Sequence, residues 1–219
     1  MDGGITWPAS SAGMAAAWEI QRLMEALMAS WPRRGRRVLV VGADPGVHCR
    51  FFWSCGFDVV LAVPDPRVLA EARQSLGAAA DVHLAQPDHL PWEEDAVDYA
   101  LVLFAMTSKN RQAVVTEAVR VARSGVMLVF GDTLALARPL TPSLPQTGPW
   151  WELRRLLRLA HPAGRIRSAS VAPGLRFLWG ASMPLLPPGI GPCCGILHDF
   201  SPTPTTTPLW AWRHGVETS

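Results

Sequence analysis

The chain has little charge of either sign, almost no lysine and no long apolar run. Charged residues make up 17% of its 219 residues, and Lys109 is its single lysine. Its 20 basic and 18 acidic side chains leave a formal net charge of +2, which is too small to indicate a nucleic-acid partner. No apolar run approaches the ~20 residues that a membrane-spanning helix needs, so we expect no membrane span.

The first residues lack the features of a secretory signal. The segment 1–13 carries an acid at Asp2, has no basic stretch and contains no continuous apolar core. A signal peptide needs a basic beginning followed by an apolar region. We therefore expect a cytoplasmic location.

Cysteine is scarce, and its spacing excludes the common metal motifs. The four cysteines are Cys49, Cys55, Cys193 and Cys194, and no pair has C-x-x-C spacing. We therefore expect no zinc or other metal site. The adjacent Cys193 and Cys194 form either a redox-active pair or plain core packing, and the lack of a neighbouring cation to stabilise a thiolate favours packing.

The most informative stretch is RRVLVVGADPGV at 36–47, an apolar run that ends in a glycine turn. Residues 38–41 are typical of a strand buried on both faces, and Gly42 with Gly46 allows a tight turn beside a ligand. Nucleotide-type cofactors bind at such turns, at the carboxyl end of a strand. The G-x-G-x-x-G motif of nicotinamide dehydrogenases is absent, because Asp44 and Val47 occupy its second and third glycine positions.

Strand and helix patterns alternate after this turn for more than ninety residues. The apolar patterns and the Gly and Pro boundaries predict helices at 47–54, 66–76 and 111–123, and strands at 57–63, 81–85, 98–104 and 126–130. Alternation of this kind is typical of right-handed βαβ units. We predict a doubly wound α/β fold with a mostly parallel sheet.

The regions on either side of this core are less regular. Helical spacing predicts an N-terminal helix at 10–30, and prolines mark an irregular region after 132. Within that region we predict a helix at 150–161 and short strands at 166–171, 176–179 and 195–200, two of which pair antiparallel at the sheet edge. We expect one domain at 1–200, with its core at 36–132 and a C-terminal elaboration at 133–200, followed by a low-complexity tail at 201–219.

Four segments resemble blocks of the class I S-adenosylmethionine-dependent methyltransferases, in particular the small-molecule branch related to ubiquinone and menaquinone biosynthesis. They are RRVLVVGADPG, VLAVPDPRVLAEAR, LAQPDHLPWEEDAVDYALVLFAM and EAVRVARSGVMLVF. These stand where the family has its glycine-rich loop, its ribose-binding segment, its adenine-contacting segment and its fourth and fifth strands. In the last segment, Glu117, Arg120 and Val121 match the family's Glu-x-x-Arg-Val.

The resemblance implies S-adenosylmethionine as the cofactor and a Rossmann-like methyltransferase fold. It also implies a set of cofactor-binding positions at the ends of the first four strands. These positions are Gly42, Ala43, Asp44, Gly46, Val63, Pro64, Asp65, Gln86, Pro87, Asp88 and Phe104.

The chain departs from the family at its polar anchors. Val40 and Asp44 replace an acid and a glycine of the loop, Val63 replaces the acid that binds the ribose hydroxyls, and Gln86 replaces the acid that reads the adenine amino group. Asp65 could compensate at the ribose, and Gln86 or Asp88 at the adenine. Asp44 either pairs with the cofactor's cationic group or caps the following helix.

The resemblance also places the acceptor pocket between segments 7–31, 104–110 and 133–165. These segments are rich in Trp, Met and Leu, which predicts a small, largely apolar acceptor. Methyl transfer needs positioning more than a protein nucleophile, and no general base is evident. His48, His89 and His161 are candidates for a general base by residue type alone, and a surface or packing role is favoured for each of them. A catalytically inactive binding or scaffold protein is the alternative function.

The basic run at 33–37 also has two interpretations. Its four arginines suggest phosphate binding, but a solvated loop before a buried strand would have the same composition. The loop interpretation is favoured.

Overall fold

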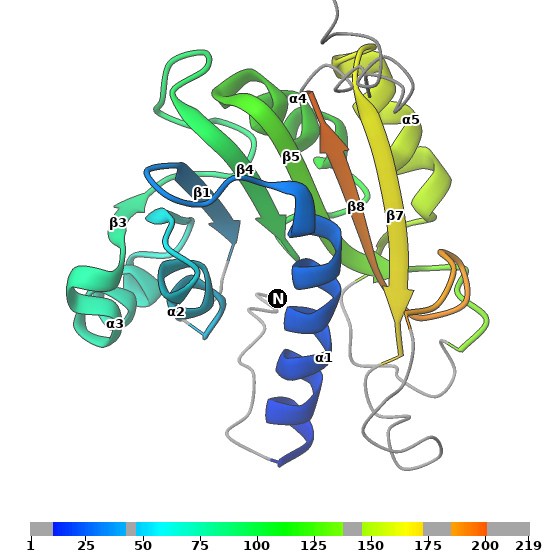
Figure 1. Cartoon of the computed structure of the whole chain (residues 1–219), viewed down its shortest axis with the longest axis horizontal. Coiled ribbons are helices and arrows are strands. Elements are labelled where there is room, and N and C mark those ends of the chain that lie inside the picture. The colour runs from blue at the N-terminus through cyan, green and yellow to red at the C-terminus, as the bar shows by residue number, and fades with distance from the viewer. Residues whose placement is uncertain (1–10, 43–46, 138–145, 173–184, 201–219) are drawn as a thin grey trace, which may run out of the picture.

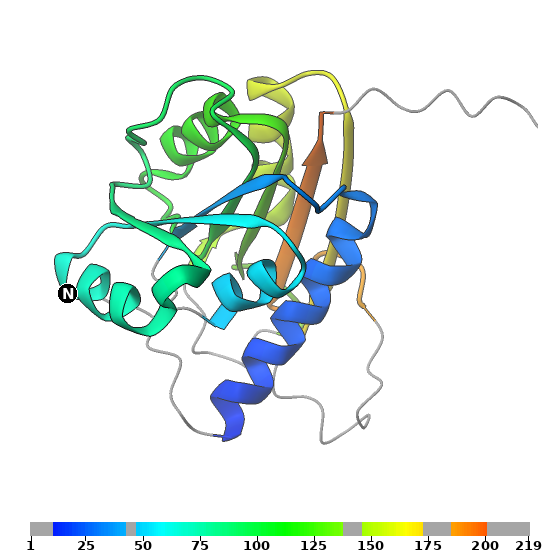
Figure 2. The same ribbon diagram turned by 60° about the vertical axis from the view of Figure 1, so that its left-hand side comes forward.

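A central eight-stranded sheet organises the molecule, with helices on both faces (Figures 1 and 2). The structure is a computed structural model that describes residues 11–42, 47–137, 146–172 and 185–200. Its strands are ordered β3-β2-β1-β4-β5-β8-β7, and β6 pairs with β5 off this path. The predicted doubly wound, mostly parallel sheet is confirmed.

The strands lie close to where the apolar runs predict them. They are β1 (Arg37–Gly42), β2 (Asp58–Val63), β3 (Asp81–Leu84), β4 (Val97–Leu103), β5 (Ala122–Asp132), β6 (Gln146–Gly148), β7 (Arg165–Val171) and β8 (Cys193–Asp199). The first five are parallel neighbours, whereas β8 runs antiparallel to both β5 and β7. The expected antiparallel pair at the sheet edge is therefore β7 with β8. The strand predicted at 176–179 lies outside the described residues.

The helices also follow the predicted boundaries. They are α1 (Ser11–Leu27), α2 (Val47–Ser54), α3 (Pro66–Leu76), α4 (Arg111–Val121) and α5 (Trp150–Ala160), with short 3-10 turns η1 (Met28–Ser30) and η2 (Gly77–Ala79). Among the described residues, no helix has both the length and the apolar character needed to cross a membrane. The prediction for α4 was two residues too long, because the chain passes from Val121 directly into β5 without a loop.

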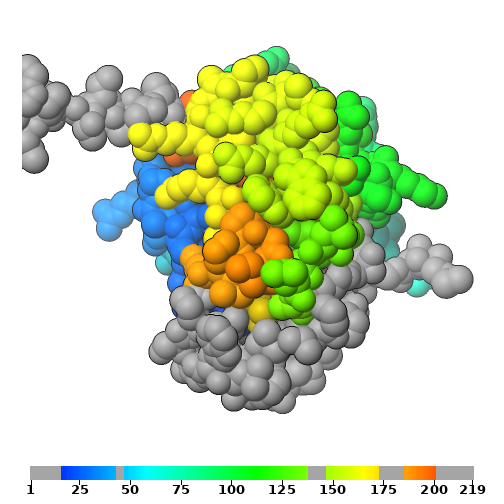
Figure 3. Space-filling model, turned by 90° about the vertical axis from the view of Figure 1, so that its right-hand side faces the viewer, coloured from blue at the N-terminus to red at the C-terminus, as the bar shows by residue number. Residues whose placement is uncertain are grey.

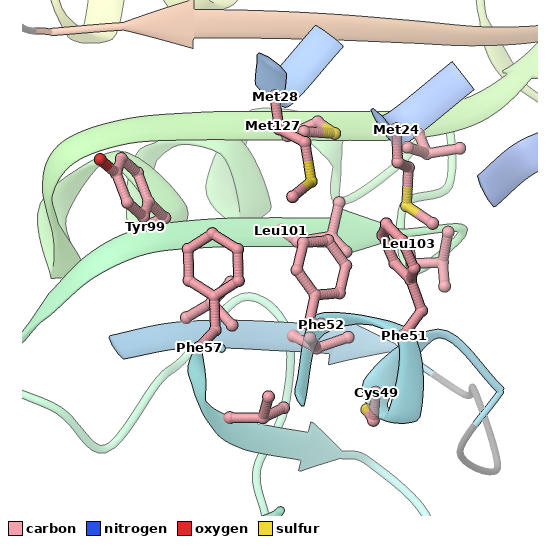
Figure 4. Close-up of a cluster of buried hydrophobic side chains, with 14 of the residues drawn as sticks. Met24, Met28, Cys49, Phe51, Phe52, Phe57, Tyr99, Leu101, Leu103 and Met127 are labelled. Carbon is pink, nitrogen blue, oxygen red and sulfur yellow. The ribbon is translucent and has the colours of Figure 1, made fainter. Parts of the chain in front are cut away.

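Alternate residues of each strand enter two separate cores. Val38 and Val40 of β1 pack with α1, α2 and α3 on one face, whereas Leu39 and Val41 pack with α4 and α5 on the other. This division follows from the two-residue period of a strand. Figure 4 shows the first core, where Met24 of α1, Met28 of η1, and Phe51 and Phe52 of α2 meet Leu101 and Leu103 of β4.

Aromatic contacts stabilise the part of this core that lies near the beginnings of β1, β2 and β4. Trp31 stacks on Tyr99 with ring centroids 4.0 Å apart, and the Phe57 ring meets Tyr99 edge-on at 6.1 Å. Burial raises the pKa of Tyr99 to about 12, so this phenol stays neutral. The contacts anchor the start of β4 beneath the segment that joins α1 to β1.

Candidate cofactor and acceptor site

The carboxyl ends of β1 and β4 mark the position of the candidate site. These two strands are neighbours, yet the chain runs outward from β1 to β2 and β3 on one side and from β4 to β5 on the other. Ligands of open α/β sheets bind where the strand order reverses in this way. The last paired residues there are Gly42 and Leu103.

Gly42 is needed because the two strands approach each other too closely for a side chain. Its φ is +146°, and a Cβ atom at this position would overlap the carbonyl oxygen of Leu103 and lie 3.6 Å from the Cβ of Ala105. Glycine is the residue that accepts both conditions. The predicted loop continues with Ala43, Asp44 and Gly46, which lie outside the described residues. Both roles predicted for Asp44 therefore stay open.

The end of β2 offers no carboxylate at the family's ribose position. Val63 is fully buried in the first core, so its side chain belongs to the interior. Asp65 lies two residues further on, where its Oδ1 accepts a hydrogen bond from the backbone N–H of Arg67 at 2.8 Å. Asp65 is thus the N-cap of α3, and Pro66 occupies the first helical position after it.

The end of β3 is tied to the end of β2. The Ala85 N–H donates to Val63 O at 2.9 Å, and Gln86 Nε2 donates to Pro64 O at 3.4 Å. Pro87 is buried, whereas Gln86 and Asp88 are exposed. The structure therefore brings Pro64 and Gln86 together and leaves two exposed polar side chains beside this junction.

Phe104 ends β4 in a strained conformation. Its φ is +51°, a left-handed value that costs a residue other than glycine on the order of 1–2 kcal/mol. The backbone N–H of Phe104 donates to Val129 O at 2.9 Å, and its half-buried ring packs against the first core. Strained residues of this kind gather at binding sites. The role of Phe104 at the cofactor stays a prediction.

Sequence reasoning missed a group of contacts on the β5 side of the site. The short strand β6 places Thr147 Oγ1 within 3.2 Å of Met106 O, in a buried contact. Arg111, the first residue of α4, donates to Thr147 O at 3.4 Å and forms an ion pair with Glu152 of α5 at 2.6 Å. Segments 106–111 and 146–152 are therefore joined beside β5. The segments predicted to form the acceptor pocket include most of this region, but the sequence did not predict the contacts within it.

Buried groups behind this edge have structural roles. Asp132 ends β5 with no exposed surface, and its Oδ1 accepts from the Leu134 N–H at 3.0 Å. Cys193 and Cys194 are free and fully buried in β8, and burial raises the pKa of both thiols. A raised thiol pKa opposes redox reactivity, so the packing interpretation of this pair fits the structure.

The three candidate histidines do not share one location. His48 is fully buried in α2, just after the glycine turn, and His89 is exposed near the end of β3. His161 ends α5, where its ring stacks on Phe200 at 4.0 Å. Phe200 follows the end of β8, which is paired with the beginning of β5, so His161 belongs to the amino edge of the sheet. No group of three or more metal-ligating side chains occurs among the described residues.

The amino edge of the sheet has features of its own. Arg36 and Arg37 form ion pairs with Asp98 and Asp58 at 2.8 Å and 2.7 Å, as a solvated loop before a buried strand would. A hollow of about 410 Å³ lies at the starts of β2 and β3, lined by Trp53, Phe57, Asp58, Val59 and residues 78–81. This hollow is on the opposite edge from the strand ends described above, so it is not the predicted cofactor cleft.

The carboxyl edge fits an adenosyl cofactor, except at the ribose anchor. Gly42 keeps the space beside Leu103 free of a side chain, and Asp65, Gln86 and Asp88 supply exposed polar atoms at the ends of β2 and β3. Val63 supplies only apolar contact. The polar anchors therefore differ from the family's in position and charge, while the backbone frame is retained.

Comparison with known families also indicates the carboxyl edge of the sheet as the candidate site. Residues 39–130, from β1 into β5, match the family model described as a methyltransferase domain. This segment of the chain is therefore similar to a methyltransferase domain. The matched segment contains Gly42, Asp65, Gln86 and Phe104. No match was found among curated protein sequences.

Solved structures share the fold of the matched segment and of the residues on either side of it. An S-adenosylmethionine-dependent methyltransferase of Thermotoga maritima, a possible histamine N-methyltransferase, aligns with a TM-score of 0.66 at 15% identity, over 87% of this chain and 92% of that one. Magnesium protoporphyrin IX methyltransferase of Synechocystis PCC 6803 with bound SAH gives 0.64 at 13% identity, over 92% and 90%. A putative methyltransferase of Haloferax volcanii, in complex with the Trm112 activator, gives 0.63 at 12% identity, over 88% and 95%.

Identities this low establish the fold alone. The family match and the fold together support an S-adenosylmethionine-dependent methyltransferase, with S-adenosylmethionine as the cofactor. None of these matches favours the alternative of an inactive scaffold, and none selects the ubiquinone-like branch.

Proposed function

We propose that this methyltransferase transfers a methyl group from S-adenosylmethionine to a small, largely apolar acceptor, as a member of the small-molecule branch that it resembles. The observation that carries the proposal is the position of the family match. The matched residues 39–130 include every strand end around the β1–β4 reversal, where Gly42 closes against Leu103.

Cofactor contacts are assigned to the ends of four strands. Gly42, Ala43, Asp44 and Gly46 would pass beside the cofactor after β1, and Pro64 with Asp65 would lie beside it after β2. Gln86, Pro87 and Asp88 after β3, and Phe104 after β4, would complete the site, with Val63 beneath it. Phe104 supplies an aromatic ring whose position is fixed by the strained turn and by its packing against the core.

When bound, the cofactor would supply a methyl group on a cationic sulfur, for in-line displacement at the methyl carbon with the neutral thioether as the leaving group. The protein then has to bind, orient and exclude water, and positioning of this kind provides much of the rate acceleration. Phe104 and the buried Met106 provide apolar surface next to the β4 end. Arg111, Thr147 and Glu152 hold the segment after β5 against the segment after β4.

An apolar acceptor agrees with the side chains around this edge. Met106 and Ala135 are buried there, and Trp150 is half-buried at the start of α5. Arg111 and Glu152 form an ion pair with each other, so neither charge needs a partner on the acceptor. Apolar and aromatic walls with few polar groups are typical of small-molecule pockets.

Titration calorimetry with S-adenosylmethionine and with its demethylated product tests the proposal. We expect micromolar affinity for both, and a weaker affinity for Phe104→Ala, because the variant removes the ring beside the predicted cofactor position. Trp53→Ala is the matched control, since Trp53 is an exposed aromatic residue at the opposite edge and its loss should leave the affinity unchanged. No heat with millimolar ligand would overturn the proposal and favour a scaffold.

A further inference from the structure

Helix α5 exposes large apolar side chains among its arginines. Trp151 is 48% exposed and Leu159 is 69% exposed, whereas Leu153 and Leu157 on the other side are fully buried in the second core. Positions 151, 155, 158 and 159 lie on one side of a helix with about 3.6 residues per turn. The outward side of α5 therefore presents Trp, Arg, Arg and Leu, rather than the uniformly polar side of an ordinary surface helix.

A neighbouring segment extends this apolar character. Leu134 is 61% exposed and Leu136 is 79% exposed. The Leu136 N–H donates to Gly189 O at 3.0 Å. Gly189 lies against the Trp150 ring, since a Cβ atom added at Gly189 would be 3.2 Å from Trp150 Nε1. Figure 3 shows α5, segment 185–190 and segment 131–137 side by side on one face of the molecule. We call Leu134, Leu136, Trp151, Arg155 and Leu159 the Trp151 face.

The charge beside this face is positive. Helix α5 carries Arg154, Arg155 and Arg158, and its single acid, Glu152, is already paired with Arg111. Arg158 donates to the carbonyls of Pro162 and Gly164, both at 3.2 Å, so it also closes the end of the helix while keeping its charge. Arg154 and Arg155 lie on the same helix turn, between Trp151 and Leu159.

We propose that the Trp151 face docks on the surface of an anionic lipid bilayer. Tryptophan and leucine that insert at the headgroup level, together with arginines that meet anionic phosphates, are the features by which helices lie in a membrane interface. The three arginines of α5, whose single acid is already paired with Arg111, make this side of the helix complementary in charge to anionic headgroups. The docking is peripheral and does not depend on methyl transfer.

Vesicle co-sedimentation with the full chain tests this inference. We expect binding to vesicles of phosphatidylcholine with phosphatidylglycerol, and not to vesicles of phosphatidylcholine alone, and we expect 0.5 M salt to weaken it. Arg154→Gln with Arg155→Gln should weaken binding about 25-fold, since each arginine near an anionic surface contributes roughly fivefold. Trp151→Gln with Leu159→Gln should weaken it at every salt concentration, because the apolar insertion is lost.

Matched controls distinguish binding through the Trp151 face from nonspecific vesicle binding by other exposed tryptophans and arginines. Trp53→Gln removes an exposed tryptophan of α2, and Arg34→Gln with Arg67→Gln removes two exposed arginines outside α5, so both variants should bind vesicles as the parent does. Failure of the parent to sediment with anionic vesicles at low salt would overturn the inference, and so would an equal loss in the controls. Sedimentation velocity showing a dimer that Trp151→Gln dissociates would also overturn it, because a second copy would then cover the face.

Discussion

Val63 and Asp65, on either side of Pro64 at the end of β2, have different structural roles. Val63 is the last residue of the strand and fills the first core, whereas Asp65 leaves the core and caps α3. A carboxylate at position 63 would be buried among apolar side chains, and the burial of an unpaired charge is strongly unfavourable. The core packing of this chain is therefore compatible with Val63, and the nearest carboxylate is the capping one.

Substitution of Asp65 separates capping from cofactor binding. Asp65→Ala should lower the free energy of unfolding by about 0.5–2 kcal/mol, because the N-cap acceptor is lost. Asp65→Asn should keep the stability, since asparagine caps equally well, but should weaken S-adenosylmethionine binding about tenfold if the charge also serves a ribose hydroxyl. Urea unfolding and calorimetry measure the two effects. An unchanged affinity in Asp65→Asn would restrict Asp65 to its capping role.

Some of these residue roles could be predicted from the sequence and others could not. The burial of Val63 follows from the apolar run FDVVLAV, and a cap at Asp65 is consistent with Pro66 immediately after it. The left-handed backbone of Phe104 could not be predicted, because it results from contact between β4 and β5, including the bond to Val129 O. Thr147 was missed for the same reason, since its partner Met106 is 41 residues away.

At the scale of elements, α4 holds the long connection between β3 and β4. Arg120 donates to Trp92 O at 2.7 Å and to Leu90 O at 3.0 Å, and it forms a two-point ion pair with Glu117. Glu117 in turn accepts from the Leu90 N–H at 3.0 Å. The Glu-x-x-Arg pattern thus has a structural purpose: one turn of α4 binds the backbone of the Leu-Pro-Trp turn from both sides.

Replacement of Arg120 should loosen this connection. Arg120→Lys keeps the charge but cannot place donors on Glu117, Leu90 and Trp92 at once, so we expect the free energy of unfolding to fall by about 2 kcal/mol or more. Arg123→Lys is the matched control, because Arg123 is exposed and its guanidinium donates to a backbone carbonyl, Asp95 O, at 2.9 Å. The control should change stability by less than about 0.5 kcal/mol. Equal effects in urea unfolding would contradict the account.

The elements themselves were largely predictable, and the exceptions have a common cause. Helix α3 was predicted with its observed bounds, because Pro66 and Gly77 mark its ends and apolar residues recur between them. Strand β6 was missed, because three residues between prolines have no periodicity and become a strand only through pairing with β5. Strand β5 is longer than its apolar run, because Gly125 and its neighbours pair with both β4 and β8.

At the scale of the whole molecule, the two edges of the sheet differ in character. The carboxyl edge contains the close approach at Gly42 and the strained Phe104, which lie beside the predicted cofactor. At the amino edge, the imidazoles of His161 and His198 each donate a hydrogen bond to Ala163 O, at 2.9 Å and 2.7 Å, which ties α5 to β8. We therefore expect pH to act on global stability through the amino edge.

His198 determines the direction of that pH effect. Burial lowers its pKa below the usual value of 6.5, and the nearby His161 and Arg158 lower it further, against the opposing effects of the hydrogen bond to Ala163 and the charge of Asp199. Protonation would add an N–H at Nδ1, which is buried and has no hydrogen-bond partner in the described part of the chain. The folded state therefore favours the neutral imidazole.

The stability of the protein should fall as the solution becomes acidic. A histidine with a lowered folded pKa binds its proton more readily when unfolded, so the free energy of unfolding should decrease as the pH drops below about 6.5 and level off below the folded pKa. His198→Gln keeps an N–H donor but does not titrate, so urea unfolding between pH 5 and pH 8 should show a shallower slope. His89→Gln, at an exposed histidine near β3, should keep the parent's slope. If His198→Gln retained the full slope and His89→Gln lost it, the pH dependence would arise at the carboxyl edge instead.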